Sequence, residues 1–337
     1  MSKNNIKHYD DSVTIPKTLL SVSNISISFS QYSKGLRQTI LNVVEDLDLD
    51  VHEGEIVAIL GSSGSGKSLL AHAILGILPM NSLLTGEMKY EGKILDQKLK
   101  EELRGDEIAL IPQSVDFLDP LMKVGDQVIG DIEDEKREEK RKTMIKIFEN
   151  YDLKEDVADL YPFQLSGGMA RRVLFSTSLI NNPKLIIADE PTPGLDEKSL
   201  KETLNYLKIM AKERRGVILI THDIHAAVEI ADKIAIFYSG YVIEVNKTEN
   251  FSGNGDKLLH PYTRALYKAL PDNGFQLFEG NQPINIDTKD KCIYYDRCNQ
   301  SIEKCKHSNP DLVEINGMKI RCYFVEEQHN KQNSANG

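Results

Sequence analysis

The residues with the clearest chemistry form a loop rich in glycine and serine. Residues 61–68 have the spacing G-x-x-x-x-G-K-S, directly after the apolar run Ile56–Leu60. In such a loop, backbone N–H groups and a lysine surround phosphate oxygens, and the last hydroxyl can ligate Mg²⁺. A simple Gly-Ser turn is the alternative, but an apolar strand before the loop and an apolar helix after it favour a nucleotide site. The predicted site consists of Gly61, Ser62, Ser63, Gly64, Ser65, Gly66, Lys67, Ser68 and Leu69.

Two adjacent carboxylates, Asp189 and Glu190, follow the apolar run Leu185–Ala188. Asp189 is placed to hold Mg²⁺, directly or through water, and Glu190 to polarise a water for in-line attack on the γ-phosphorus. An acidic pair at a strand end is a weak signal by itself, because acidic loops are common. Downstream of a phosphate-binding loop, the catalytic interpretation is favoured.

Four further polar positions lie at the ends of predicted elements. The run Leu165–Met169, with Ser166, Gly167 and Gly168, opens a helix, and on its own it indicates only a serine N-cap. Gln113 and His222 each follow an apolar strand, and Asp196 precedes a helix. A single histidine at a strand end is usually an ordinary hydrogen-bonded side chain. The order of these residues along the chain gives them their significance.

The elements that position these residues alternate between apolar strands and helices, which predicts parallel strands covered by helices. Two earlier segments, Ile25–Phe29 and Leu47–Val51, alternate polar and apolar residues and indicate antiparallel strands. Residues 114–168 contain charged helical stretches and indicate a helical insertion. We predict strands at 56–60, 107–111, 185–188, 217–220 and 233–238, and helices at 69–78, 133–150, 168–180, 197–212, 224–231 and 260–266.

Composition limits the choice of partner and compartment. The 337 residues carry a formal net charge of −10, which argues against nucleic acid as the main partner. We find no apolar run long enough for a membrane span and no signal-peptide core, and we expect a cytoplasmic protein. All four cysteines lie within 292–322, and in a reducing compartment such a cluster indicates a metal site more than disulfides.

The phosphate-binding loop, Gln113, the Leu165–Met169 run, the Asp189–Glu190 pair, Asp196 and His222 together resemble the ATP-binding subunits of ABC transporters, over about residues 19–245. The resemblance implies a P-loop ABC ATPase fold: a RecA-like α/β core, an antiparallel β-subdomain and a helical insertion. It predicts a flexible tail at 1–17, the ATPase domain at 18–248 with its helical subdomain at about 114–168, and a C-terminal extension at 249–337.

The family roles transfer residue by residue. Ser166 and Gly168 would grip ATP held on the loop of a second, homologous ATPase subunit, and Asp196 would cross that interface. His222 would touch the γ-phosphate and hold the attacking water, and Gln113 would contact Mg²⁺ and that water. Phe29 is the candidate for stacking on adenine, with Tyr32 as the alternative. Pro193 and Gly194, and the run Met169–Arg172, depart from the usual pattern at this interface without removing a catalytic group.

The tail resembles the C-terminal extension of ATPases that serve dipeptide, oligopeptide and nickel importers. The resemblance rests on His260–Leu266 and on the order of four cysteines, Cys292, Cys298, Cys305 and Cys322. Their spacing alone indicates four thiolates with the metal undecided. The resemblance favours a structural or redox-sensing [4Fe–4S] cluster over zinc, with free structural cysteines as the third alternative.

The resemblance predicts a peripheral subunit on the cytoplasmic face of the membrane. It would pair with a second ATPase, docking on permease subunits through the Gln113 loop and the helical insertion, with a solute-binding protein as an indirect partner. The solute stays open among dipeptides, oligopeptides, nickel and metal chelates. Two alternatives are a soluble ABC protein of ribosomes or DNA, and a regulatory subunit that binds ATP without turnover. Glu190 argues against the second.

Overall fold

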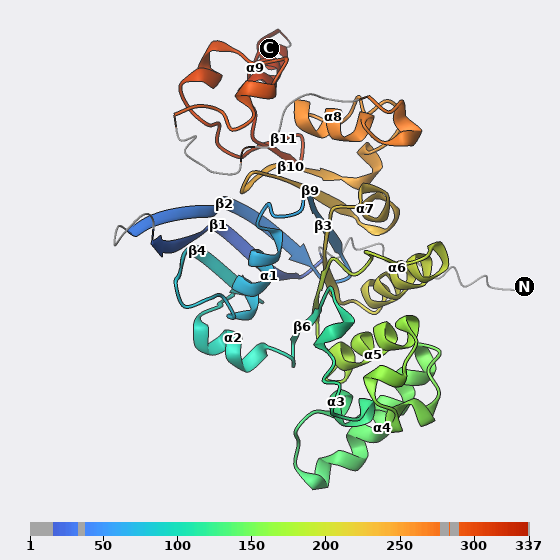
Figure 1. Ribbon diagram of the computed structural model, residues 1–337. Helices are drawn as coiled ribbons and strands as arrows, with labels where there is room; N and C mark the ends of the chain where they lie inside the picture. The colour runs from blue at the N-terminus through green and yellow to red at the C-terminus, as the bar shows by residue number, and fades with distance from the viewer. Residues whose placement is uncertain (1–15, 33–37, 277–282, 284–289, 336–337) are drawn as a thin grey trace, which may run out of the picture.

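The computed structural model describes residues 16–32, 38–276, 283 and 290–335. Its main sheet runs through the centre of the molecule (Figure 1). The strands from β9 to β6 are parallel, as the alternation of strands and helices predicts. In spatial order the sheet contains β11 (Val313–Ile315), β12 (Met318–Ile320), β10 (Tyr241–Lys247), β9 (Lys233–Tyr238), β3 (Ile56–Gly61), β8 (Gly216–Thr221), β7 (Leu185–Asp189) and β6 (Ile108–Ile111).

Helices cover both faces of this sheet, which explains why its central strand is apolar throughout. Ile56, Ala58 and Leu60 of β3 belong to one buried cluster, and Val57 and Ile59 belong to another. The first cluster includes side chains from α5 (Gly167–Leu179), α6 (Glu197–Lys212) and α7 (Ile224–Ile230). The second includes side chains from α1 (Lys67–Leu75). Gly76, at φ 67°, ends α1 three residues before the predicted boundary.

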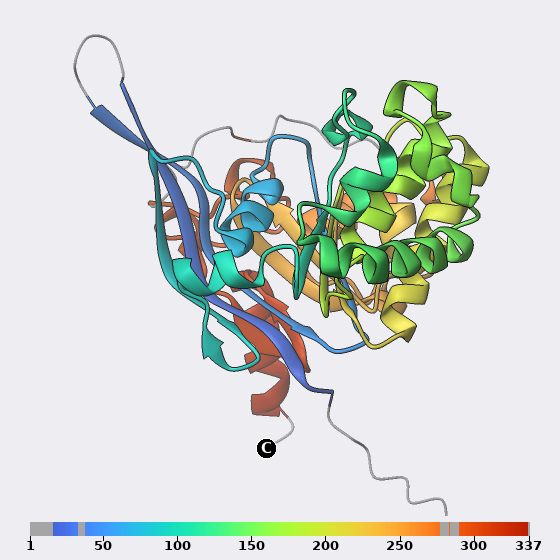
Figure 2. The same ribbon diagram turned by 90° about the horizontal axis from the view of Figure 1, so that it is seen from below.

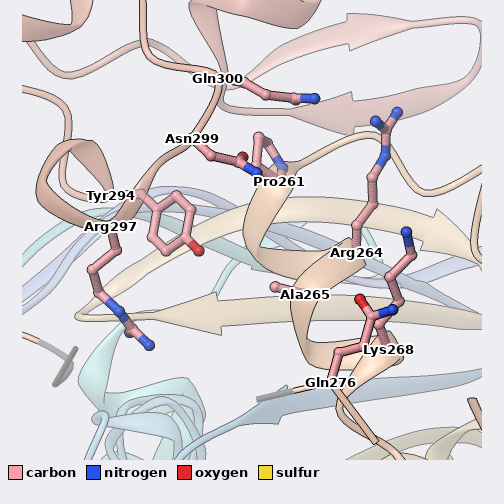
Figure 3. Close-up of a pocket in the computed structure, with 9 residues that line it drawn as sticks. All are labelled: Pro261, Arg264, Ala265, Lys268, Gln276, Tyr294, Arg297, Asn299 and Gln300. Atoms are coloured by element: carbon pink, nitrogen blue, oxygen red, sulfur yellow. The ribbon is translucent and has the colours of Figure 1, made fainter. Parts of the chain in front are cut away.

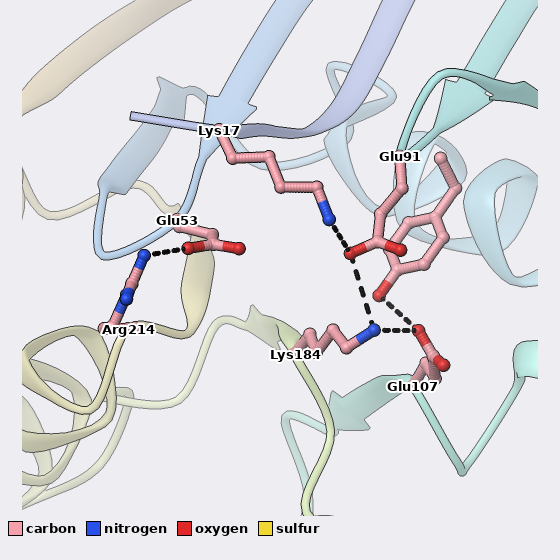
Figure 4. Close-up of polar contacts among 7 residues, drawn as sticks. Lys17, Glu53, Glu91, Glu107, Lys184 and Arg214 are labelled. Carbon is pink, nitrogen blue, oxygen red and sulfur yellow. Dashed lines mark hydrogen bonds and ion pairs between the residues drawn. The ribbon is translucent and has the colours of Figure 1, made fainter. Parts of the chain in front are cut away.

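A second, antiparallel sheet lies beside α1 and confirms the predicted β-subdomain. Its order is β2 (Gln38–His52), β1 (Thr18–Tyr32), β4 (Ser82–Tyr90) and β5 (Lys93–Ile94), and α2 (Gln97–Leu103) follows it. The first two strands have 15 residues each and are therefore far longer than the alternating segments indicated. Where this sheet meets β6 and β7, Lys184 lies 3.4 Å from Glu91 and 3.1 Å from Glu107 (Figure 4).

The helical insertion forms a lobe of its own, next to α5 (Figure 2). It contains α3 (Val124–Ile129) and α4 (Asp134–Asn150). Met144 and Phe148, predicted to share one face of the helix, are fully buried in a cluster with Val124 and Val173. The predicted helix at 133–150 is confirmed within one residue.

The C-terminal extension, which the sequence predicts as a separate element, adds two short strands to the edge of the main sheet. It includes α8 (Pro261–Lys268) and α9 (Tyr323–Ala335), and the short strand β12 pairs with β10. Strands of three residues are too short to leave a periodic pattern, so the sequence did not predict β11 and β12. The predicted tail at 1–17 falls almost entirely outside the described residues. Within the described part of the chain, every helix is too short or too polar to cross a bilayer.

Candidate active site

The phosphate-binding loop joins β3 to α1, and its glycines are required by its shape. A side chain at Gly61 would place its Cβ 2.6 Å from the carbonyl oxygen of Phe237 on the neighbouring strand. Gly66 has φ 100° and is packed against Val43. The Ser65 hydroxyl is buried without a hydrogen-bond partner among the described residues. An unpartnered polar atom inside such a loop fits a site that receives its partner from a ligand.

Lys67, the first residue of α1, points back into the loop. Its Nζ donates to the carbonyl oxygens of Gly61 at 2.9 Å and Ser62 at 2.8 Å, and lies 3.8 Å from Glu190 Oε1. Burial lowers the pKa of Lys67, and the Glu190 and Asp189 carboxylates oppose that shift. The loop carbonyls therefore hold a cation where phosphate oxygens would replace them.

Ser68 and Asp189 provide the oxygen atoms expected of a magnesium site. The Ser68 hydroxyl donates to Asp189 Oδ1 at 3.0 Å, although the two residues are 121 positions apart. Burial raises the pKa of Asp189, and the hydrogen bond from Ser68 opposes that shift. A hydroxyl and a carboxylate are ligands that Mg²⁺ accepts, usually together with waters and substrate phosphates. The donor set therefore fits a magnesium–nucleotide substrate.

Glu190 and His222 are brought together by adjacent parallel strands. The register pairs Asp189 with Ile220, so β7 and β8 end at the same edge of the sheet. The Glu190 N–H donates to the Ile220 carbonyl oxygen at 2.8 Å, and Glu190 has φ 45°. Its Oε2 lies 2.5 Å from His222 Nδ1. A carboxylate held beside an imidazole at this edge can orient and deprotonate a water.

Gln113 lies at the same edge, one strand further along. Ile111 of β6 pairs with Ala188 of β7, so Gln113 and Glu190 each lie two residues beyond a paired position. Gln113 is exposed. The topology therefore brings the five predicted groups Lys67, Ser68, Gln113, Asp189–Glu190 and His222 to one end of the sheet.

Ser166, Gly167, Gly168 and Asp196 lie outside this group. Ser166 caps α5 by accepting from the Met169 N–H at 3.3 Å, and α5 lies next to the helical lobe, away from α1 (Figures 1 and 2). Added Cβ atoms at both glycines would meet open space. Asp196 caps α6 and is exposed. These residues present hydrogen-bonding groups outward, where a second molecule could meet them.

A cavity of about 330 Å³ adjoins the loop on the side of β2. Leu41, Asn42 and Val43 line it together with the loop serines, and sequence reasoning had assigned none of these three a role. The mostly apolar run Ile40–Val44, interrupted by Asn42, was the available signal, but it resembles any half-buried strand. Phe29 of β1 pairs with Leu41 of β2 and packs against the core, whereas Tyr32 is 69% exposed. Adenine stacking by either aromatic residue stays a prediction.

The four cysteines gather in one part of the extension. Cys292, Cys305 and Cys322 are buried, Cys298 is half-buried, and the Cys292 N–H donates to the Cys305 carbonyl oxygen at 2.8 Å. Burial raises the pKa of Cys292 to about 12 and that of Cys322 to about 11. Among the described residues, no group of three or more Cys, His, Asp or Glu is arranged to hold a metal. The structure therefore does not support the predicted cluster.

Comparison with known proteins is consistent with this geometry. The sequence family described as "ABC transporter" matches residues 44–193, and "Oligopeptide/dipeptide transporter, C-terminal region" matches residues 243–305. The dipeptide transport ATP-binding protein DppD of Caldanaerobacter subterraneus is 33% identical over 315 residues, covering 87% of this chain and 94% of that protein. The oligopeptide transport ATP-binding protein AppD of Bacillus subtilis is 29% identical, covering 94% and 99%.

Solved structures extend the similarity to the fold. A dimeric, post-hydrolysis ATP-binding cassette bound to ADP and phosphate has a TM-score of 0.56 and 28% identity, covering 68% of this chain and 99% of that one. A nucleotide-free cassette of an ABC transporter has a TM-score of 0.58 and 22% identity, covering 74% and 98%, and shows the fold alone. Both comparisons support the predicted P-loop ABC ATPase fold.

Proposed function

The chain belongs to the ATP-binding subunits of the dipeptide and oligopeptide family of ABC transporters, and from this premise we propose that it energises peptide uptake. ATP binding and hydrolysis follow from the family. The observation that supports this function best is the edge where the Lys67 loop, the Ser68–Asp189 pair and the Glu190–His222 pair meet. This edge can hold a magnesium–nucleotide and activate a water, as an ATPase requires.

The proposed roles follow from these contacts. When nucleotide binds, Lys67 Nζ would donate to β- and γ-phosphate oxygens in place of the loop carbonyl oxygens, and Ser68 and Asp189 would hold Mg²⁺. Glu190 takes the proton of the attacking water, and His222, at 2.5 Å, orients the Glu190 carboxylate and contacts the γ-phosphate. Gln113 would contact Mg²⁺ and the attacking water, and so link the nucleotide site to the loop that follows it.

The exposed helix start at Ser166 supports a two-subunit catalytic unit. Ser166, Gly167, Gly168 and Asp196 lie away from the Lys67 loop and face outward. We propose that they complete the ATP site of a second, homologous ATPase, which in turn supplies the same residues to this one. The solved cassette dimer bound to ADP and phosphate is consistent with that arrangement. We expect the partner to be a different chain, making a heterodimer.

The permease contact is proposed at the segment after Gln113. Phe117 is 71% exposed, Leu121 87% and Met122 43%, and exposed apolar side chains this close together usually indicate an interface. A subunit docked there would lie on the cytoplasmic face of the membrane. Replacing all three residues by Ser should release the chain from permease-containing membranes while nucleotide affinity stays within about twofold. Retention of both binding and transport in this variant would mean that the segment only packs internally.

The solute is proposed to be a peptide because the similar proteins carry dipeptide and oligopeptide names. Nickel and metal chelates stay as the alternative. The test is to co-purify the chains that accompany this subunit from membranes, then measure ATP-dependent uptake of labelled di- and oligopeptides, with nickel uptake in parallel. Transport of peptides without nickel supports the proposal, and transport of nickel alone contradicts it. A solute-binding protein among the companions would account for specificity.

The cysteine-bearing extension could carry a metal cofactor, and we propose that Cys292, Cys298, Cys305 and Cys322 bind a [4Fe–4S] cluster. Four thiols confined to one segment are soft ligands suited to iron–sulfur or zinc. The cluster would stabilise the extension as a cross-link, since ATP hydrolysis needs no electron carrier. Anaerobic purification followed by iron, sulfide and zinc analysis tests this. Zinc without sulfide would replace the cluster, and absence of metal would leave protonated structural cysteines.

A further inference from the structure

Two runs of the chain that have no role in the proposed function contact each other. Arg171 belongs to the run Met169–Arg172 on α5, and Pro191 begins the run Pro191–Gly194. The Arg171 guanidinium donates a hydrogen bond to the Pro191 carbonyl oxygen. These two runs contain the departures from the usual family pattern, and the fold places one against the other.

The contact lies directly after Glu190, the proposed base. Glu190 has φ 45°, a left-handed conformation that residues other than glycine adopt rarely and only where surrounding contacts enforce it. One such contact is the hydrogen bond from the Glu190 N–H to the Ile220 carbonyl oxygen at 2.8 Å. The bond from Arg171 to Pro191 holds the chain on the other side, one residue further on. The backbone around Glu190 is therefore fixed by β8 on one side and by α5 on the other.

Arg171 differs from other arginines of the chain in what surrounds its charge. Arg172 donates to Glu202 at 3.1 Å, and Arg297 lies 5.8 Å from the ring centre of Tyr294 (Figure 3). Burial lowers the pKa of Arg171, and within the described residues no carboxylate opposes that shift. The Arg171 Nε atom is buried and has no hydrogen-bond partner in that part of the chain. Because desolvation of a cation without a counter-ion costs free energy, stability alone does not explain this contact.

Arg171 also lies about one turn beyond the start of α5, where Ser166 and the two glycines after it face outward. We propose that Arg171 is a positioning residue, which holds Glu190 in the orientation that hydrolysis needs and connects it to the helix start that meets the ATP of the second subunit. This inference rests on the proposed function. Rigid secondary elements carry coupling between sites, so a displacement of the first turn of α5 would reach Glu190 through Arg171 and Pro191.

The test is ATP hydrolysis by the assembled transporter with an inactivated partner subunit. Arg171→Met keeps a long side chain without a donor, and should lower kcat about tenfold because a small displacement of the base misaligns the attacking water. KM for ATP and nucleotide affinity should stay within about twofold, since no phosphate contact is lost. Arg171→Lys retains one charged donor, which suffices for a single carbonyl oxygen, and should keep at least about half of the wild-type kcat.

Arg215→Met is the matched control, because Arg215 makes the same kind of contact at the opposite end of β7. Its Nε donates to the Pro183 carbonyl oxygen at 3.1 Å, and its side chain is 15% exposed. The same substitution there should lower the denaturant midpoint of the chain while kcat stays within about twofold. Rates are expressed per nucleotide-binding subunit, so that partial unfolding of either variant does not count as a loss of kcat.

Combination with Glu190→Gln separates a positioning role from a structural one. If Arg171 acts through the Glu190 carboxylate, adding Arg171→Met should lower the residual hydrolysis of Glu190→Gln by less than about twofold. A further loss of about tenfold would show that Arg171 acts independently of Glu190, and would overturn the proposal.

Three other results would overturn the proposal. The first is an equal loss of kcat in Arg171→Met and Arg215→Met. The second is a kcat of Arg171→Lys as low as that of Arg171→Met, which would show that the hydrogen-bond donor has no role. The third is a rise in KM without a fall in kcat, which would place Arg171 in nucleotide binding. Hydrolysis by the wild-type transporter tests the proposed function separately, so a failure of that function is distinguished from a failure of this inference.

Discussion

The nucleotide edge and the C-terminal extension are built on different principles. At the nucleotide edge, parallel strands end side by side and bring polar residues together, as in the Glu190–His222 pair. Ser68, in the first turn of α1, adds the Ser68–Asp189 pair at the same edge. The extension instead pairs its short strand β12 with β10 and is anchored by two buried side chains, Glu244 and Arg321, which are 0% and 2% exposed. Repetition of one topology builds the first region, whereas one short strand pairing and long-range side-chain contacts hold the second.

The difference has a consequence for robustness. Removing one group at the nucleotide edge changes chemistry but leaves the apolar sheet beneath it intact, because β3 and β8 are buried throughout and β7 is buried up to its last residue, Asp189. Removing one anchor of the extension leaves its buried hydrogen-bond partners unpaired, with no other group to replace it. We therefore expect mutations at the edge to affect turnover and mutations at the anchors to affect local stability.

The largest effect is expected from Glu190→Gln. An amide cannot accept the proton of the attacking water, so hydrolysis should fall about 10²–10⁴-fold, while ATP affinity stays close to that of the wild type. The measurement is phosphate release by the assembled transporter at saturating ATP. The partner subunit should carry its own inactivating substitution, so that its turnover does not mask the loss. Near-normal hydrolysis in that complex would exclude Glu190 as the base.

The second prediction concerns Glu244, which joins β10 to the start of α8. Its carboxylate accepts from the N–H groups of Leu259 at 3.0 Å and His260 at 2.8 Å, and burial raises its pKa. Glu244→Ala leaves both donors unpaired and should destabilise the extension by about 3 kcal/mol. Glu244→Gln retains an acceptor oxygen and should cost about half as much. Hydrogen exchange of the α8 amides measures both, and equal protection in wild type and Ala variant would contradict the anchoring role.

The third prediction tests the contact between the extension and the antiparallel sheet. Arg321 donates to Asp46 Oδ2 at 2.8 Å, across 275 positions of sequence, and to the carbonyl oxygens of Val242 and Pro310. Arg321→Met keeps much of the apolar stem but removes these bonds, and should cost about 2 kcal/mol. Limited proteolysis should then cut the C-terminal segment first, with nucleotide affinity unchanged. If the C-terminal segment and nucleotide binding were lost together at one denaturant concentration, the two regions would unfold as one cooperative unit, which would contradict this prediction.

The same contrast explains how much the sequence could predict. The parallel strands could be predicted because each is an apolar run in the sequence. The neighbours of Lys67 could be predicted because the carboxyl ends of parallel strands lie at one edge of the sheet, where the motif residues follow. Glu244 and Arg321 could not be identified, because a buried ion has no periodic signature and its partner is set by tertiary packing. The [4Fe–4S] cluster was predicted from four cysteines in one stretch and from a family resemblance, and it stays a prediction, because neither signal determines how the four side chains are arranged in space.

The smallest expected effect concerns the surface charges where the antiparallel sheet meets β6 and β7. Lys184, whose side chain is 47% exposed, lies 3.4 Å from Glu91 and 3.1 Å from Glu107 (Figure 4). Lys184→Met should therefore cost only about 0.5–1 kcal/mol, less in high salt. Glu107 would keep the hydrogen bond from the Tyr90 hydroxyl at 3.0 Å, and Glu91 would keep Lys17 at 2.6 Å.

The pH dependence of this variant gives the sharper test. Hydrogen bonding from Lys17, with the charges of Lys184 and Lys17, lowers the pKa of Glu91 below its usual 4.5. The stability that Glu91 contributes is therefore present above about pH 4.5 and is lost as the pH falls through its lower folded-state pKa. The difference in unfolding free energy between wild type and Lys184→Met should accordingly be constant near neutrality and shrink in acid.

Lys201→Met is the matched control, because it breaks the more exposed pair between Lys201 and Glu197 on α6. It should cost less at every pH, since both side chains of that pair are largely solvated. Denaturant midpoints from pH 3 to 7 test this ranking, and an equal cost for both variants would show that Lys184 adds no more than an ordinary surface ion pair.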